Sequence, residues 1–120
     1  VLTQHDIRQL QLAKGAIVSG VMMLQNVMDV SDEKLKELML CGGFGNYIST
    51  ESAVKIKLLP NLELDTITYL GNAAHLGAQM ALLSELERDR AQKIASEVQH
   101  VALATHPDFQ NIFVEALKFD

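Results

Sequence analysis

The strongest constraint on the fold is an alternation of two hydrophobic patterns along the chain. In the first part, up to Met28, apolar residues recur every three or four positions, which places them on one face of a helix. Short apolar stretches bounded by turn residues, which are typical of strands, then alternate with further helical stretches. Short buried strands that alternate with helices define the α/β class. We therefore expect an α/β fold.

The two patterns also predict where the elements lie. Strands are expected over residues 36–41, 66–70 and 101–104, and helices over residues 3–28, 49–58, 73–83, 85–99 and 107–117. The first helix carries glycines in its interior, each of which costs about 1 kcal/mol relative to alanine. Its small residues Ala13, Ala16 and Gly20 share one edge. We expect another backbone or a ligand to approach that edge closely, with tight helix packing as the favoured explanation.

Length and composition limit the number of domains, the classes of partner and the cellular compartment that we expect for this chain. A chain of 120 residues suffices for one core, so we expect a single domain over residues 1–120. Because the net charge is −5 and no basic patch exists, we expect no nucleic-acid partner. No apolar run reaches the roughly 18–20 residues that span a bilayer, so no membrane contact is expected. A start without methionine or a signal peptide predicts a fragment of a cytoplasmic protein.

The reactive side chains do not form a recognisable catalytic or metal-binding set. The single cysteine, Cys41, excludes an internal disulfide and an iron–sulfur cluster held by this chain, which needs about four thiolates. Cys41 is expected to be a buried strand residue. The four histidines lack the spacing of metal ligands, and no nucleophile–base arrangement can be argued. We predict no catalytic residue and no metal ligand.

A glycine-rich loop, residues 42–45, follows the first predicted strand. Glycine lets a phosphate or a ribose approach the backbone, and open α/β sheets bind ligands at the carboxyl ends of their strands. The spacing matches neither the dinucleotide fingerprint nor a P-loop, so a plain tight turn is an equal alternative. A second small-residue cluster, residues 71–78, opens a predicted helix. Close packing is favoured there, and an anion at the helix N-terminus is the alternative.

The order of these segments resembles the last third of the superfamily of acetate and sugar kinases, heat-shock chaperones and actin. A helix with small residues, the strand and double-glycine loop of residues 38–46, another helix and the cluster 71–78 carry that resemblance. It implies a partial actin-like, ribonuclease H-like ATPase domain. In that superfamily the strand and double-glycine loop form the adenosine motif.

Four separated blocks, residues 6–17, 43–48, 71–74 and 104–109, are similar to the reductive activators of corrinoid proteins. The resemblance covers nearly the whole chain and implies a parent protein that uses ATP with magnesium. Such activators are iron–sulfur electron donors that return cob(II)alamin to cob(I)alamin, so the implied partner is a corrinoid protein involved in methyl transfer. The iron–sulfur cluster belongs to a separate domain that this chain lacks. The chain alone is therefore expected to be inactive.

By the same resemblance, six residues are expected to bind the nucleotide. Gly42 and Gly43 would face the ribose and the α-phosphate, Phe44 and Asn46 would line the pocket, and Gln11 and Lys14 would reach the ribose or adenine. Two alternatives stay open. The chain could be an interaction or homodimerisation module without a small ligand, or an unrelated α/β enzyme that binds a phosphorylated metabolite at the double glycine.

Overall fold

The computed structural model describes residues 1–43 and 47–119. The helices and strands in this part of the chain are, in order, α1 (Gln4–Met28), β1 (Leu38–Cys41), α2 (Thr50–Lys55), β2 (Ile67–Gly71), α3 (Ala73–Leu83), α4 (Glu85–Glu97) and α5 (Phe109–Ala116). Short 3₁₀ turns at Asp32–Lys34, Leu64–Thr66 and Leu103–Thr105 lie between them. The α/β class is confirmed, and these elements lie close to the predicted bounds.

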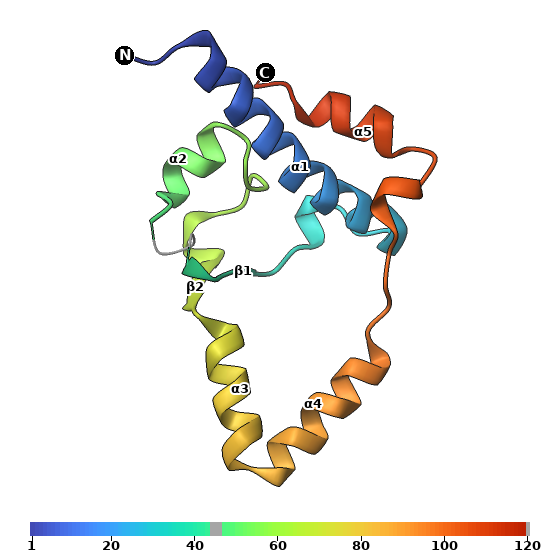
Figure 1. The fold of residues 1–120 in the computed structure, drawn as a ribbon. Coiled ribbons are helices and arrows are strands. Elements are labelled where there is room, and N and C mark those ends of the chain that lie inside the picture. The colour runs from blue at the N-terminus through green and yellow to red at the C-terminus, as the bar shows by residue number, and fades with distance from the viewer. Residues whose placement is uncertain (44–46, 120) are drawn as a thin grey trace.

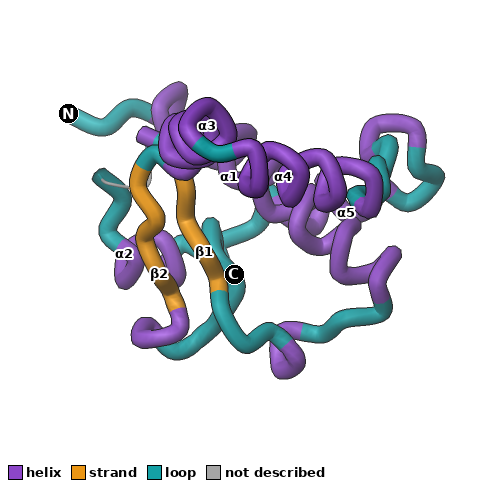
Figure 2. The backbone as a smooth tube through the Cα atoms, turned by 90° about the horizontal axis from the view of Figure 1, so that it is seen from below, coloured by secondary structure: helices purple, strands orange, loops and turns teal. Residues whose placement is uncertain are grey.

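The strands β1 and β2 pair in parallel and lie side by side (Figures 1 and 2). Leu38 lies opposite Ile67, and the register shifts by one residue between Leu40 and Cys41. Parallel neighbours need a crossover connection, and α2 with its flanking loops supplies it. Consequently both strands end at the same edge of the sheet, and α3 begins there (Figure 2).

The best-buried packing in the described residues joins the two ends of the chain. The helix α5 runs along α1 (Figure 1), and the rings of Phe109 and Phe113 stack with their centroids 5.9 Å apart. The buried residues of α1 include Gly15, Ser19 and Met23, which are four positions apart and therefore lie on one face. That face, and not the predicted small-residue edge, is the covered one.

The arrangement is open. The radius of gyration is 16.7 Å, whereas a compact chain of this length has a value of about 14 Å. The helices α3 and α4 contact each other and project as a V from the rest of the chain (Figure 1), and neither contains a buried residue. The described part of the chain therefore lacks a single enclosed core.

Three expectations are wrong. Residues 101–104 form no strand, because a 3₁₀ turn closes there with a hydrogen bond from the His106 N–H to the Leu103 carbonyl at 3.1 Å. Cys41 is exposed, since side chains of β1 alternate between exposed and half-buried positions. Ala13 and Ala16 are exposed as well, so the tight packing expected along their edge is absent there among the described residues.

Candidate functional site

Two glycine turns meet at the carboxyl edge of the sheet. Gly42 follows β1 with φ +93°, and Gly71 ends β2 with φ +62°. Both values lie in the left-handed region that other residues rarely adopt. The Gly42 N–H donates a hydrogen bond of 2.8 Å to the Gly71 carbonyl. The two turns therefore form one joined unit, which the sequence presented as two separate clusters.

The space around these turns is open. A Cβ atom built at Gly42, Gly43 or Gly71 would have no heavy atom of the described residues within 4 Å. Backbone conformation explains the glycines at Gly42 and Gly71. Gly43 has no left-handed φ and no close neighbour in the described chain, so neither strain nor packing there requires a glycine. Gly43 is therefore open to close approach by a ligand or by a part of the protein outside the described residues.

The helix α3 starts directly at this edge. The Asn72 side chain caps it by accepting a hydrogen bond of 3.1 Å from the His75 N–H. The first N–H groups of a helix attract anions because they lack partners within the helix. The carboxyl edge thus combines two glycine turns with a capped helix N-terminus.

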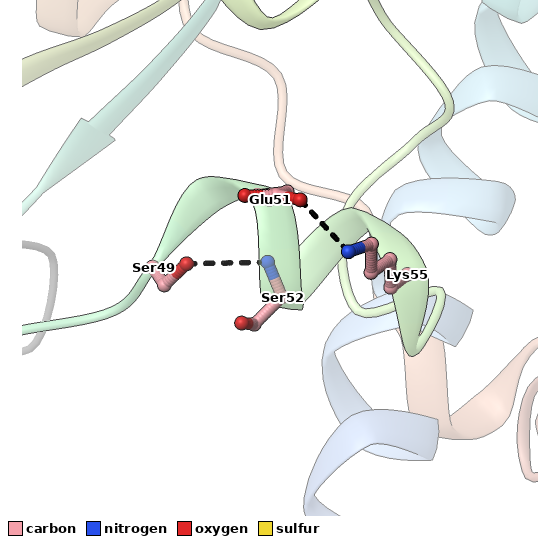
Figure 3. Close-up of polar contacts among 4 residues, drawn as sticks. All are labelled: Ser49, Glu51, Ser52 and Lys55. Carbon is pink, nitrogen blue, oxygen red and sulfur yellow. Dashed lines mark hydrogen bonds and ion pairs between the residues drawn. The ribbon is translucent and has the colours of Figure 1, made fainter.

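The segment that follows the glycine loop is anchored locally (Figure 3). The Ser49 hydroxyl caps α2 by accepting a hydrogen bond of 3.3 Å from the Ser52 N–H. The Lys55 ammonium lies 2.7 Å from a Glu51 carboxylate oxygen, and its hydrogen bond holds the pKa of that carboxyl below the ordinary value. Just before the cap, the Tyr69 hydroxyl of β2 donates to the Ile48 carbonyl. These bonds fix where the loop ends.

Gln11 and Lys14 lie away from the carboxyl edge of the sheet, beneath the C-terminal segment, residues 117–119, which follows α5. The Gln11 side chain donates a hydrogen bond of 3.4 Å to the Leu117 carbonyl, and the Lys14 ammonium donates to the Lys118 carbonyl. Lys14 is only 1% exposed, and its ammonium lies 4.8 Å from the centroid of the Phe119 ring. The structure therefore brings these two predicted residues together with the C-terminal segment, whereas Gly42 and Gly43 lie at the sheet edge.

The other two predicted site residues, Phe44 and Asn46, lie outside the described residues. In the described part of the chain no three His, Cys, Asp or Glu side chains converge to hold a metal ion. None of the helices described here combines the length and apolar character needed to cross a membrane.

Sequence reasoning missed a cavity of about 650 Å³. It lies between the second half of α1, the start of the first 3₁₀ turn and the end of α2. The residues that line it are Val18, Val21, Met22, Gln25, Asn26, Val30, Ser31, Asp32, Val54, Lys55, Lys57, Leu58, Leu59, Pro60 and Asn61. A polar pair on its wall, Gln25 and Asp32, is joined by a hydrogen bond of 2.7 Å. The separate segments that form this cavity share no sequence signal, because tertiary packing alone brings them together.

The element order and the joined glycine turns agree with the class of protein that the sequence resembles, a domain of the acetate and sugar kinase, heat-shock chaperone and actin superfamily, present here in part. The family described as "C-terminal domain of RACo the ASKHA domain" matches residues 1–120, and the chain belongs to that family. The resemblance noted in the sequence is thereby confirmed.

Two relatives agree with this assignment. The chain is 38% identical over 114 residues to the corrinoid activation enzyme RamQ of Eubacterium limosum, covering 95% of this chain and 19% of that protein. A solved structure of a reductive activator for a corrinoid, iron–sulfur protein superposes with a TM-score of 0.87 at 33% identity, covering 97% of this chain and 18% of that one. The chain thus spans about a fifth of the length of these relatives.

Proposed function

We propose that this chain is the C-terminal nucleotide-binding part of an ATP-dependent iron–sulfur protein that reductively activates corrinoid proteins. The open backbone at Gly43 carries the proposal, because a glycine that neither conformation nor packing requires is one that a ligand can approach. The family membership supplies the class of ligand. The names of the relatives supply the corrinoid target.

In this proposal ATP with magnesium occupies the carboxyl edge of the sheet. The backbone of Gly42 and Gly43 faces the ribose and the α-phosphate, and Phe44 and Asn46 line the same pocket. Gln11 and Lys14 contact the ribose or adenine. Bound ATP would supply the free energy for an otherwise unfavourable electron transfer. The iron–sulfur cluster resides in a separate part of the protein, since this chain has one cysteine. The intact protein works in the cytoplasm.

The test is calorimetry with MgATP on the intact protein that contains this chain. Gly43→Val should weaken ATP binding roughly ten- to hundredfold, which corresponds to about 1–3 kcal/mol for a lost close contact. Gly43→Ala is the graded control and should have a smaller effect because its side chain is one methyl group. Asn46→Ala removes a polar contact without filling space. Since Gly43 lies outside the left-handed region, these variants do not strain the turn in the way that Gly42→Ala would.

Thermal melts of each variant show whether the loop still folds. If Gly43→Val melts and binds MgATP as the wild-type protein does, the glycine loop is only a turn and the nucleotide assignment is wrong. The second candidate function, a docking module, is favoured by the exposed large apolar side chains such as Leu82 and Leu83. That candidate requires the intact protein to bind its partner equally well with and without nucleotide.

A further inference from the structure

The described chain on both sides of Gly43 is hydrogen-bonded to the same strand, β2. On the N-terminal side, the Gly42 N–H donates a hydrogen bond of 2.8 Å to the Gly71 carbonyl. On the C-terminal side, the Tyr69 hydroxyl donates a hydrogen bond to the Ile48 carbonyl. Tyr69 and Gly71 lie two positions apart in β2. These two hydrogen bonds, the two anchors, therefore tie both flanks of Gly43 to one end of one strand.

The anchor at Tyr69 joins elements that are already fixed in place. Tyr69 lies opposite Leu40 in the parallel pairing of β1 and β2, so the sheet holds its backbone. Directly after Ile48, the Ser49 hydroxyl caps the first turn of α2. The hydrogen bond from Tyr69 therefore sets the start of α2 relative to the carboxyl edge of the sheet.

The backbone at Gly43 depends on such anchors. A Cβ atom built at Gly43 would have no heavy atom of the described residues within 4 Å, so side-chain packing at that point does not restrain it. Glycine also loses more conformational freedom than any other residue when it becomes ordered. A ligand that binds against an unrestrained glycine must offset this loss, whereas anchors on both sides reduce it before the ligand arrives.

We propose that Tyr69 is a positioning residue of the nucleotide site. By holding the Ile48 carbonyl, its hydroxyl keeps the Gly43 backbone where the ribose and the α-phosphate bind. This inference rests on the proposed nucleotide-binding function and adds to it a residue that acts on the nucleotide only through the chain around Gly43.

The variant Tyr69→Phe tests this role, because it removes the hydroxyl and keeps the ring. In MgATP calorimetry on the intact protein, the affinity should fall about three- to tenfold, the factor that corresponds to one net hydrogen bond. Tyr47→Phe is the matched control, since it makes the same chemical change on a side chain that is 90% exposed, and its affinity should be unchanged. Wild-type affinity in Tyr69→Phe, or an equal loss in both variants, overturns the inference.

A double-mutant cycle with Gly43→Val distinguishes positioning from a general effect on stability. If Tyr69 acts through Gly43, Tyr69→Phe should have little further effect once the valine side chain fills the space that the ligand needs. A role in overall stability alone would lower the melting temperature and leave the two losses of affinity additive. Additive losses therefore overturn the positioning role.

Nuclear magnetic resonance relaxation of the wild-type protein supplies a readout that needs no variant, and so stands even if Tyr69→Phe fails to fold. Without nucleotide, the Gly43 amide should have an order parameter of about 0.85, the value of rigid backbone, because both flanks are anchored. A value below about 0.6, typical of flexible backbone, would mean that the anchors do not hold Gly43 and overturns the inference.

The failure of this inference and that of the proposed function give different results. If Gly43→Val weakens MgATP binding and Tyr69→Phe does not, the nucleotide site stands and the role of Tyr69 is wrong. If Gly43→Val has no effect, the nucleotide site at the glycine turns is wrong, and with it the role of Tyr69. Weakening by both variants that is not additive supports both proposals.

Discussion

At the residue scale, two glycines in the same helix serve different purposes. A Cβ atom at Gly15 would lie 2.7 Å from a terminal methyl carbon of Leu117 and 3.4 Å from the Phe113 ring. At Gly20 the nearest atom would be a Leu103 methyl carbon at 3.7 Å, an ordinary contact distance. Gly15 therefore permits the approach of α5, whereas Gly20 leaves room for a methyl group.

This contrast predicts opposite effects of filling the two positions. Gly15→Leu should lower the free energy of unfolding by about 1–3 kcal/mol, because overpacking displaces Leu117 and α5. Gly20→Ala should raise it by up to about 1 kcal/mol, since alanine favours a helix over glycine. Urea unfolding of this chain, followed by circular dichroism, measures both. Wild-type stability in Gly15→Leu would show that α5 does not depend on this close approach.

At the element scale, the start of α1 is fixed by a reciprocal cap. The Asp6 N–H donates to the Thr3 hydroxyl oxygen at 3.3 Å, and the Thr3 N–H donates back to the Asp6 carboxylate at 2.8 Å. The Thr3 hydroxyl also donates to this carboxylate at 2.6 Å. The hydrogen bond from the Thr3 hydroxyl, followed by that from its backbone N–H, lowers the pKa of Asp6 below its ordinary 3.8. These bonds favour the ionised carboxylate in the folded state.

The lowered pKa gives the cap a pH dependence of known sign. Because the folded pKa lies below the unfolded one, the carboxylate stabilises the fold above pH 3.8, and this stabilisation is lost as the pH falls through the folded value. Asp6→Asn should therefore melt at a lower temperature than wild type at neutral pH, and the two melting temperatures should converge in acid. Thermal melts across that range measure it. A gap that stays constant down to the lowest pH would mean that charge is irrelevant to the cap.

At the scale of the whole molecule, the described chain leaves much apolar surface uncovered. The helix α3 contains no charged residue and no buried one, although a helix that is apolar on all sides is normally covered. Leu82 and Leu83, at its end, are 76% and 84% exposed. The chain spans about a fifth of its relatives' length, and we expect the rest of a longer protein to cover this surface.

Without that cover, the chain expressed alone should self-associate. Apolar patches beyond a few hundred Å² seldom stay in contact with water, so light scattering should give a mass above the 13.2 kDa of one chain. Replacing Leu82 and Leu83 with lysine should shift the population toward the single-chain mass. Gln92→Lys, on the charged helix α4, is the matched control and should not. A strictly monomeric wild-type chain at high concentration would contradict the expectation.

Much of this protein could be predicted from the sequence, because its signals are local. Hydrophobic period, the Thr3 cap and the turn residues around β1 and β2 depend only on neighbours a few positions away, so the α/β class and most element bounds were predicted correctly. The resemblance of four separated blocks, residues 6–17, 43–48, 71–74 and 104–109, indicated the family, which the comparison confirmed. The left-handed conformation of Gly42 also follows from its place in a tight turn after a strand.

Only the tertiary structure decided which of these residues are covered and by what. Residues 101–104 could have extended into a strand, but in the described chain a 3₁₀ turn forms at Leu103–Thr105 instead, since a strand needs a neighbour to accept its hydrogen bonds. Nothing local indicates that Lys14 lies under residues 117–119, because the contact joins positions more than a hundred residues apart. The joining of Gly42 to Gly71 has the same origin. Burial and contacts between distant segments depend on the tertiary fold of the whole chain, and the local spacing of residues does not predict that fold.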